Sequence, residues 1–192
     1  MSDHVTGASP LVFTIGHSTR SFDEVLEMLT TNGSTALVDV RSYPSSRKFP
    51  QWNQQAIQEA LPGAMAYRWI RNLGGRRHTP AGTPTPNNGW RVKAFRDYAD
   101  YMATEDFHAG LNELLALARE DGLVPAIMCS EAVPWRCHRR LIADILASEG
   151  VEVINITGPG SRHSHEPSRV LRRLGDGTWI WPADASQQQL DL

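Results

Sequence analysis

The chain has 192 residues, and its 19 lysines and arginines against 21 aspartates and glutamates give a formal net charge of -2. That balance argues against a dedicated nucleic-acid coat, because strong duplex binders carry an obvious basic excess. No apolar run approaches the roughly 20 residues that a membrane span requires, so no membrane partner is expected. The length fits one domain over 1–192, with its core at 11–157 and a polar tail at 158–192.

The two cysteines, Cys129 and Cys137, lie in one segment and are too few for a disulfide framework. The N-terminus is polar at Ser2–His4 and lacks the charged region and the cleavage site of a signal peptide. We therefore predict a cytoplasmic protein whose cysteines are thiols available for chemistry.

Short apolar runs alternate with amphipathic patterns along the chain. Ser21 and Glu24 form a capping-box pair at the start of the first helix, and Gly33 favours its end. Prolines and glycines crowd 76–90, which predicts a loop or lid. The expected elements are, in order, a strand over 11–15, a helix from Phe22 to Gly33, a strand over 36–40, a short helix from Asn53 to Leu61, a strand over 65–70, helices over 91–103 and 106–120, a strand over 124–128, a helix from Pro134 to Gly150, a strand over 151–156 and a short helix over 167–174.

Strands separated by helical patterns are typical of βαβ units. We predict a single three-layer α/β domain, Rossmann-like or rhodanese-like, with a mainly parallel central sheet of about five strands flanked by helices. In open α/β sheets, ligands bind beyond the carboxyl ends of the strands. Polar clusters follow four predicted strands at His17–Arg20, Asp39–Arg41, Gly74–Arg77 and Cys129–Glu131, so we expect them to form one site.

The segment from Cys129 to Arg140 carries most of the candidate chemistry. A thiol at a strand end that faces a helix N-terminus and several arginines has a stabilised thiolate. We predict catalytic roles for Cys129, Glu131, Cys137 and His138, with a cysteine as nucleophile or redox thiol and Glu131 and His138 as acid or base. The alternative is that both cysteines are small buried side chains.

The same segment admits a metal-binding interpretation. Cys129, Cys137, His138 and His17 offer thiolate and imidazole ligands of the kind that zinc takes. The cysteines do not form a CxxC pair, and the adjacent Cys137 and His138 would diverge on a helix. No metal is therefore part of the predicted site, and the sequence identifies no cofactor.

Arginines near the predicted strand ends indicate a small anionic, nucleotide-like substrate. Gly16 opens a strand-to-helix turn whose free N–H groups suit an anion. Asp39 and Arg41 lie on the same side of their strand, where Asp39 is either a catalytic carboxylate or an ion-pair partner that orients an arginine. The predicted substrate-binding residues are His17, Arg20, Asp39, Arg41, Arg47, Arg76 and Arg139.

These segments resemble a bacterial and archaeal family, the domain of unknown function 488 (DUF488). The resemblance covers residues 11 to 170 and rests on Thr14–Phe22, Leu37–Arg47, Leu73–Arg76, Tyr98–Met102, Cys129-Ser-Glu131 and Cys137-His138-Arg139. It implies a compact α/β fold and a shared polar site built from these residues, with no settled activity.

A looser similarity links the chain to rhodanese-like domains, in which an Asp-x-Arg strand end precedes a strand-end cysteine and an anion-cradling loop. Glu131, Pro134 and the C-x6-R spacing to Arg136 depart from that pattern. Sulfur transfer and phosphatase chemistry are therefore analogies for this chain.

Three function hypotheses follow from the sequence. The first is an enzyme that acts on a small anion. The second is a non-catalytic module that binds a nucleotide or nucleic acid through Arg71, Arg76, Arg77 and the 76–90 loop, and the third is a metal or redox protein. The oligomeric state and the substrate are not determined by the sequence.

Overall fold

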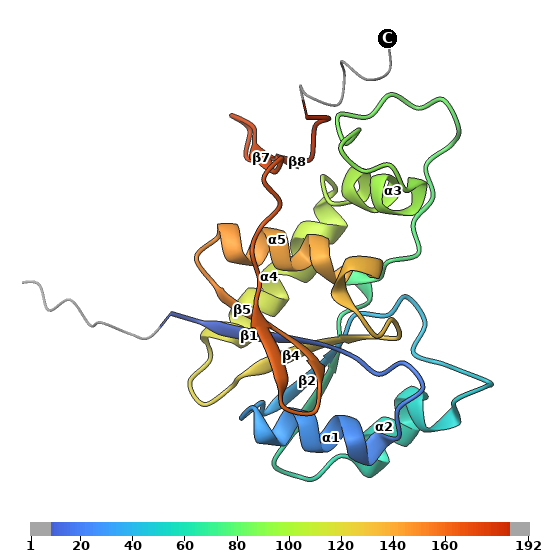
Figure 1. Cartoon of the computed structure of the whole chain (residues 1–192), viewed down its shortest axis with the longest axis vertical. Coiled ribbons are helices and arrows are strands. Elements are labelled where there is room, and N and C mark those ends of the chain that lie inside the picture. Colours follow the sequence, from blue (N-terminus) through green and yellow to red (C-terminus); the bar gives the residue numbers. More distant parts are fainter. Residues whose placement is uncertain (1–8, 185–192) are drawn as a thin grey trace, which may run out of the picture.

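Six strands form the central sheet of the computed structural model, which describes residues 9–184 (Figure 1). The prediction of no signal peptide depends on Ser2–His4, and these residues lie outside the described range. Five strands are parallel, namely β1 (Leu11–Gly16), β2 (Ala36–Asp39), β3 (Ala66–Trp69), β4 (Pro125–Cys129) and β5 (Glu152–Gly158). A sixth, β6 (Ser161–Ser164), pairs antiparallel with β5. The spatial order is β3-β2-β4-β1-β5-β6.

Helices cover both faces of this sheet. The helices are α1 (Phe22–Thr31), α2 (Gln54–Ala60), α3 (Lys93–Tyr101), α4 (Glu105–Arg119) and α5 (Arg139–Ser148). Figure 1 shows α1 and α2 below the sheet and α4 and α5 above it, with α3 farther out. The predicted three-layer α/β domain with a mainly parallel sheet is confirmed. No helix within residues 9–184 is both long and apolar enough to cross a membrane.

The core is divided in two by the sheet because neighbouring side chains of a strand point to opposite faces. In β1, Phe13 and Ile15 pack toward α1 and α2, whereas Val12 packs toward α4 and α5. The central strands are therefore buried on both sides, which explains their continuous apolar runs.

The ends of several elements follow from local sequence. Ser21 caps α1 by accepting from the Glu24 backbone N–H, and the Glu24 side chain accepts from the Ser21 N–H, as the capping box predicts. Asn53 stands at the N-cap of α2, but its side-chain oxygen instead accepts from the Ser46 N–H at 2.6 Å. Pro134 begins a separate 3-10 turn, Pro134–Arg136, and α5 starts only at Arg139.

The tail differs from its prediction. The prediction of a helix over 167–174 is wrong. A turn there leads into β7 (Arg172–Arg173), which pairs with β8 (Trp179–Ile180). Tertiary contacts explain the difference, because the Ser168 N–H donates to Asp144 at 3.2 Å and ties the segment to α5. The expected count of about five strands is also exceeded by one, because a turn at Gly160 (φ 65°) sends the chain back as β6.

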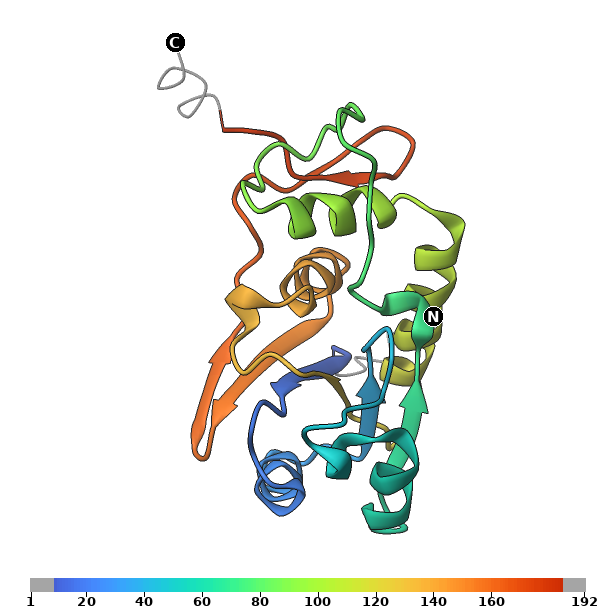
Figure 2. The same cartoon turned by 90° about the vertical axis from the view of Figure 1, so that its right-hand side faces the viewer.

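The tail and the 76–90 segment run beside each other over α3 (Figure 2). The 76–90 segment contains neither helix nor strand, as predicted. Trp181 joins the two segments: its N–H donates to the Asn87 side chain at 2.9 Å, and its carbonyl accepts from the Gly89 N–H at 2.9 Å.

Candidate functional site

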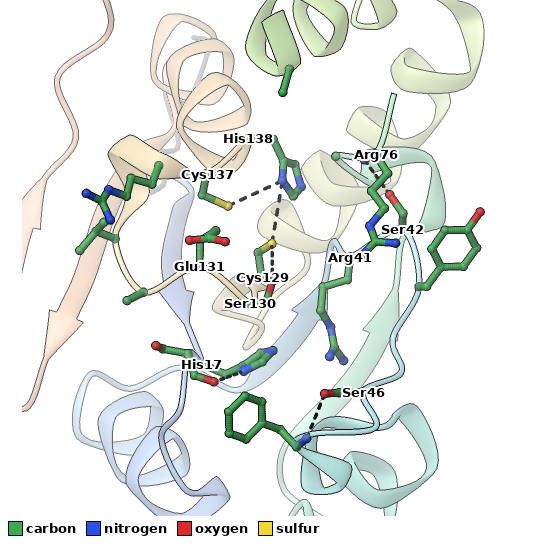
Figure 3. A pocket seen from close by; sticks show the side chains of 18 of the residues that line it. His17, Arg41, Ser42, Ser46, Arg76, Cys129, Ser130, Glu131, Cys137 and His138 are labelled. Carbon is green, nitrogen blue, oxygen red and sulfur yellow. Dashed lines mark hydrogen bonds between the residues drawn. The ribbon is translucent and has the colours of Figure 1, made fainter. Parts of the chain in front are cut away.

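A cavity of about 710 Å³ lies at the carboxyl edge of the sheet. Neighbouring strands bring their ends together here, since β1 runs into His17, β2 runs toward Arg41 and β4 ends at Cys129. Seven of the residues predicted from the sequence line the cavity: His17, Arg41, Arg76, Cys129, Glu131, Cys137 and His138 (Figure 3).

Two thiols and one imidazole converge on the cavity floor (Figure 3). His138 Nδ1 lies 3.6 Å from Cys137 Sγ and 3.9 Å from Cys129 Sγ. The three ligand-capable atoms lie within 4.8 Å of one another. Cys129 arrives from the end of β4, and the other two precede α5, so the cluster spans the strand-to-helix connection.

The two cysteines differ in their electrostatic surroundings. Burial raises the pKa of Cys137, but a hydrogen bond from Cys129 and the charge of Arg139 outweigh it, so the net shift is downward. Arg139 Nε donates to Cys137 Sγ at 3.3 Å. The pKa of Cys129 is raised by its hydrogen bond to Cys137 and by burial. Negative charge on the pair is therefore favoured at Cys137 over Cys129.

The orientation of His138 is fixed from several sides. Its Nε2 lies 3.0 Å from the carbonyl oxygen of Val40, which can only accept, so Nε2 carries a hydrogen and Nδ1 is the ring nitrogen that faces the sulfurs. The Tyr98 ring meets the imidazole edge to face at 5.0 Å. A Cβ added at Gly75 would overlap the imidazole, so only glycine allows this approach.

A buried ion pair orients Arg41 toward the cavity. Asp39 is fully buried and accepts from Arg41 Nε at 2.9 Å and from Arg41 Nη2 at 2.5 Å. The Tyr67 hydroxyl also donates to Asp39 at 3.0 Å, and the pKa of Tyr67 is raised well above its usual value by burial and by this carboxylate. The Nη1 of Arg41 has no hydrogen-bond partner within residues 9–184, which leaves it available to an anion in the cavity.

His17 is a neutral base in the cavity wall. Its Nδ1 donates to the Ser18 carbonyl at 3.0 Å, and its ring stacks on Trp52 at 4.5 Å. Burial is the main reason why its pKa falls to about 4. Its Nε2 is buried and has no partner among the described residues, so it can accept one hydrogen bond from a ligand.

The loop after Cys129 passes close to the end of β1. The His17 and Ser18 N–H groups donate to the carbonyls of Cys129 and Ser130, each at 3.0 Å. A Cβ at Gly16 would overlap the Glu131 backbone, so glycine is required there by a close approach. The Glu131 side chain is exposed, and it is the acidic side chain that lines the cavity.

Three of the predicted substrate-binding arginines do not line the cavity. Arg20 donates to the carbonyls of Gly16 and Thr157, at 2.7 and 2.9 Å, and so ties the end of β1 to β5. Arg139 is buried and holds Cys137 and the Glu131 carbonyl. Arg47 is exposed outside the cavity. The sequence pattern did not distinguish these three arginines from those that line the cavity. In the structure, their guanidinium groups bind other parts of the fold or face solvent.

Several site residues were missed by the sequence reasoning. Ser42 lines the cavity, Trp52 stacks on His17, and Tyr67 supports Asp39. Gly75 also lines the cavity, but it belongs to the predicted Gly74–Arg77 cluster, where adjacent glycines favour close backbone approach. Nothing local to Trp52 or Tyr67 indicates their partners, because both contacts bridge separate elements.

A comparison with protein-family models gives one match, to "Domain of unknown function DUF488", over residues 21–146. The chain belongs to the DUF488 family. The part that matches the DUF488 model contains Cys129, Cys137, His138 and the Asp39–Arg41 pair, whereas His17 and the tail lie outside it. No solved structure matches the chain. The looser similarity to rhodanese-like domains stays a prediction.

Proposed function

We propose that this protein is an enzyme that acts on a small anionic substrate, held by arginines over the Cys129–Cys137–His138 cluster. The observation that carries the proposal is the composition of the cavity. Arg41, Arg76 and Arg136 line it against the single carboxylate of Glu131. Cationic side chains around a concave pocket with a few reactive groups favour an anionic ligand.

The individual roles follow from the contacts. Arg41 is held rigidly by Asp39, so its free Nη1 is the fixed anion contact, and Arg76 is the exposed one. His17 accepts a hydrogen bond from the substrate. The Cys129–Cys137–His138 cluster supplies the reacting centre, with Glu131 as the acid or base at the cavity mouth.

The cytoplasm suits this proposal, since a reducing compartment keeps both cysteines as thiols. Both are free in the structure. Arg77 is a weak basis for the alternative nucleic-acid partner, because its guanidinium stacks on Tyr101 at 3.6 Å and donates to the Gly74 carbonyl at 2.9 Å.

The test is anion binding by Arg76→Ala compared with wild type. Arg76 is exposed, and its side chain makes no hydrogen bond among the described residues, so the variant should fold. We expect phosphate, pyrophosphate or a nucleoside monophosphate to stabilise the wild type in thermal unfolding. Removal of one charge-assisted contact should raise the dissociation constant about tenfold.

Arg119→Ala is the matched control, because it removes an exposed arginine at the end of α4, away from the cavity. An equal loss of anion affinity in Arg76→Ala and Arg119→Ala, or no stabilisation of the wild type by any of these anions, would contradict the proposal. Strongly salt-dependent binding to a single-stranded oligonucleotide would favour the nucleic-acid module instead.

A further inference from the structure

We infer that Cys129, Cys137 and His138 form a binding site for a soft divalent cation of the zinc class, with one coordination position open to the cavity. The inference deepens the proposed function, because it rests on the same cavity and gives the cluster a chemical role. An anionic substrate or a water molecule would be the ligand at the open position.

The first argument is the distances. Tetrahedral zinc with Zn–S of about 2.3 Å and Zn–N of about 2.0 Å requires S···N separations of about 3.6 Å. The structure has 3.6 Å from Cys137 Sγ to His138 Nδ1 and 3.9 Å from Cys129 Sγ to the same atom. The two sulfurs also fall within the 4.8 Å limit of the cluster. Both S···N separations are therefore within a few tenths of an ångström of the tetrahedral value.

The second argument is the tautomer of His138. Its Nε2 hydrogen is donated to the Val40 carbonyl at 3.0 Å, so Nδ1 is the ring nitrogen left to bind a metal beside the sulfurs. A metal-bound histidine almost always donates its other N–H to a carbonyl or carboxylate, which fixes the ring. The same arrangement is present here, and Gly75 leaves room for it.

The third argument is ligand type and charge. Two sulfurs and one imidazole suit zinc and disfavour magnesium or calcium, which prefer oxygen. Arg139 already stabilises negative charge on Cys137. A dication neutralises the charge of two thiolates and so lets the anion approach Arg41 and Arg76.

The fourth argument is the number of ligands. Within residues 9–184, the metal-capable cluster contains three side chains, and all three line the cavity. Structural zinc sites are closed by four protein ligands, whereas catalytic sites keep three and leave one position open. In Figure 3, Glu131 lies beside the cluster and His17 and Arg41 lie farther along the same cavity, so a fourth ligand could reach the metal from this side.

The experiment is a cobalt titration of the full chain after reduction and removal of metal with a chelator, in the absence of oxygen. We expect one equivalent of Co²⁺ to give a thiolate-to-cobalt charge-transfer band and the intense visible bands of tetrahedral cobalt. Added Zn²⁺ should remove both. Fully reduced wild type that gives neither band with Co²⁺, and does not compete for Zn²⁺ with a chromogenic chelator, would overturn the inference.

Variants identify the ligands. Cys129→Ser and Cys137→Ser should each weaken the charge-transfer band, and His138→Asn should lower cobalt affinity by at least about a hundredfold, beyond the range of changes outside the ligand shell. His163→Asn is the control, because it removes an exposed histidine on β6. Circular dichroism checks that each variant is folded. Retention of wild-type cobalt affinity in folded His138→Asn would contradict the site.

The experiments can contradict the enzyme proposal and the metal-site inference independently of each other. Anion binding that depends on Arg76 without any cobalt site would leave the enzyme proposal standing and remove the metal. A cobalt site without anion binding would support the metal site and contradict the anionic substrate. A thiol titration that finds no free thiols before reduction, together with no cobalt bands after it, would indicate a redox pair in place of a metal site.

Discussion

The imidazole of His138 is fixed by contacts that come from three separate segments. Val40 lies after β2, Gly75 lies in the loop after β3, and Tyr98 lies in α3. Each contact restricts the ring differently: the Val40 carbonyl fixes the tautomer, the Tyr98 ring fixes the tilt and the Gly75 backbone limits the space. The chemistry of the cluster therefore depends on residues that have no reactive group.

Gly75→Ala tests this packing. The new methyl group would overlap the imidazole, and overpacking of this kind costs about 1–3 kcal/mol. We expect a lower free energy of unfolding in urea and a weaker cobalt spectrum. Gly63→Ala is the control, because its added Cβ meets no atom within 4 Å and should change stability by less than about 0.5 kcal/mol. Equal stability of the two variants would show that Gly75 is not tightly packed.

Asp39 and Arg41 provide a second test at the residue scale. Asp39→Asn leaves Arg41, which is 7% exposed, without its carboxylate, and loss of one partner of a buried pair costs about 3–5 kcal/mol. Tyr67→Phe removes one hydrogen bond and should cost about 1 kcal/mol. Urea unfolding measures both. An Asp39→Asn cost no larger than that of Tyr67→Phe would mean that solvent reaches the pair.

Among the elements, α3 binds the 76–90 segment through several side chains. Lys93 Nζ donates to the Thr79 carbonyl at 2.8 Å and to both carboxylate oxygens of Asp97, at 2.8 and 2.7 Å, and Asp100 accepts from Thr85 and, at 2.8 Å, from Asn87. The segment itself contains no helix or strand, so side-chain contacts of this kind set its position over α3. Phe95 of α3 reaches the cavity wall, which connects this contact to the site.

The Lys93–Asp97 pair should make stability depend on pH. Burial raises the pKa of Asp97, but the hydrogen bond and charge of Lys93, together with a hydrogen bond from the Thr79 backbone and the charge of His78, outweigh burial, so the net shift is downward. The pair therefore stabilises the fold fully above the unfolded pKa, and this contribution is lost as pH falls through the folded pKa. We expect the stability difference between wild type and Asp97→Asn to shrink between about pH 5 and pH 2 in thermal unfolding. A constant difference over that range would contradict the ion pair.

Across the whole molecule, a chain of hydrogen bonds links the tail to the thiolate. Asp144 of α5 is fully buried and accepts from Trp181 Nε1 at 2.9 Å, and its other oxygen lies 2.8 Å from His165 Nε2. From there, the contacts run through His165, Asn155, Thr14, Arg139 and Cys137, at 3.4, 2.8, 3.5 and 3.3 Å in turn. The tail is thus part of the core that positions Arg139.

Trp181→Phe tests the tail. The variant leaves one Asp144 oxygen short of a donor in a buried site, which should cost about 1–3 kcal/mol in urea unfolding. Trp179→Phe makes the same change at a half-buried tryptophan of β8 that does not contact Asp144, and it should cost less than about 0.5 kcal/mol. A Trp179→Phe cost as large as that of Trp181→Phe would show that ring packing dominates.

Local patterns were sufficient for most of the fold. The Ser21–Glu24 capping box and the apolar spacing of α1 place that helix, and the apolar run into Cys129 places β4, because caps and periodicity act within one element. The family resemblance carried by the strand-end motifs is also a property of the sequence alone, and the match over residues 21–146 agrees with it.

Contacts between distant segments decided the rest. The tail from Gly158 became a strand pair and a docked tryptophan, where a helix was expected, because Asp144 and Asn87 bind it. Arg20 and Arg139, which have the same chemistry as Arg41, are held away from the cavity by their partners. The Cys129 hydrogen bond and the charge of Arg139 lower the pKa of Cys137. The sequence by itself determined which residue types stand at the strand ends. The tertiary structure alone decided which of them face the cavity, since orientation depends on partners far along the chain.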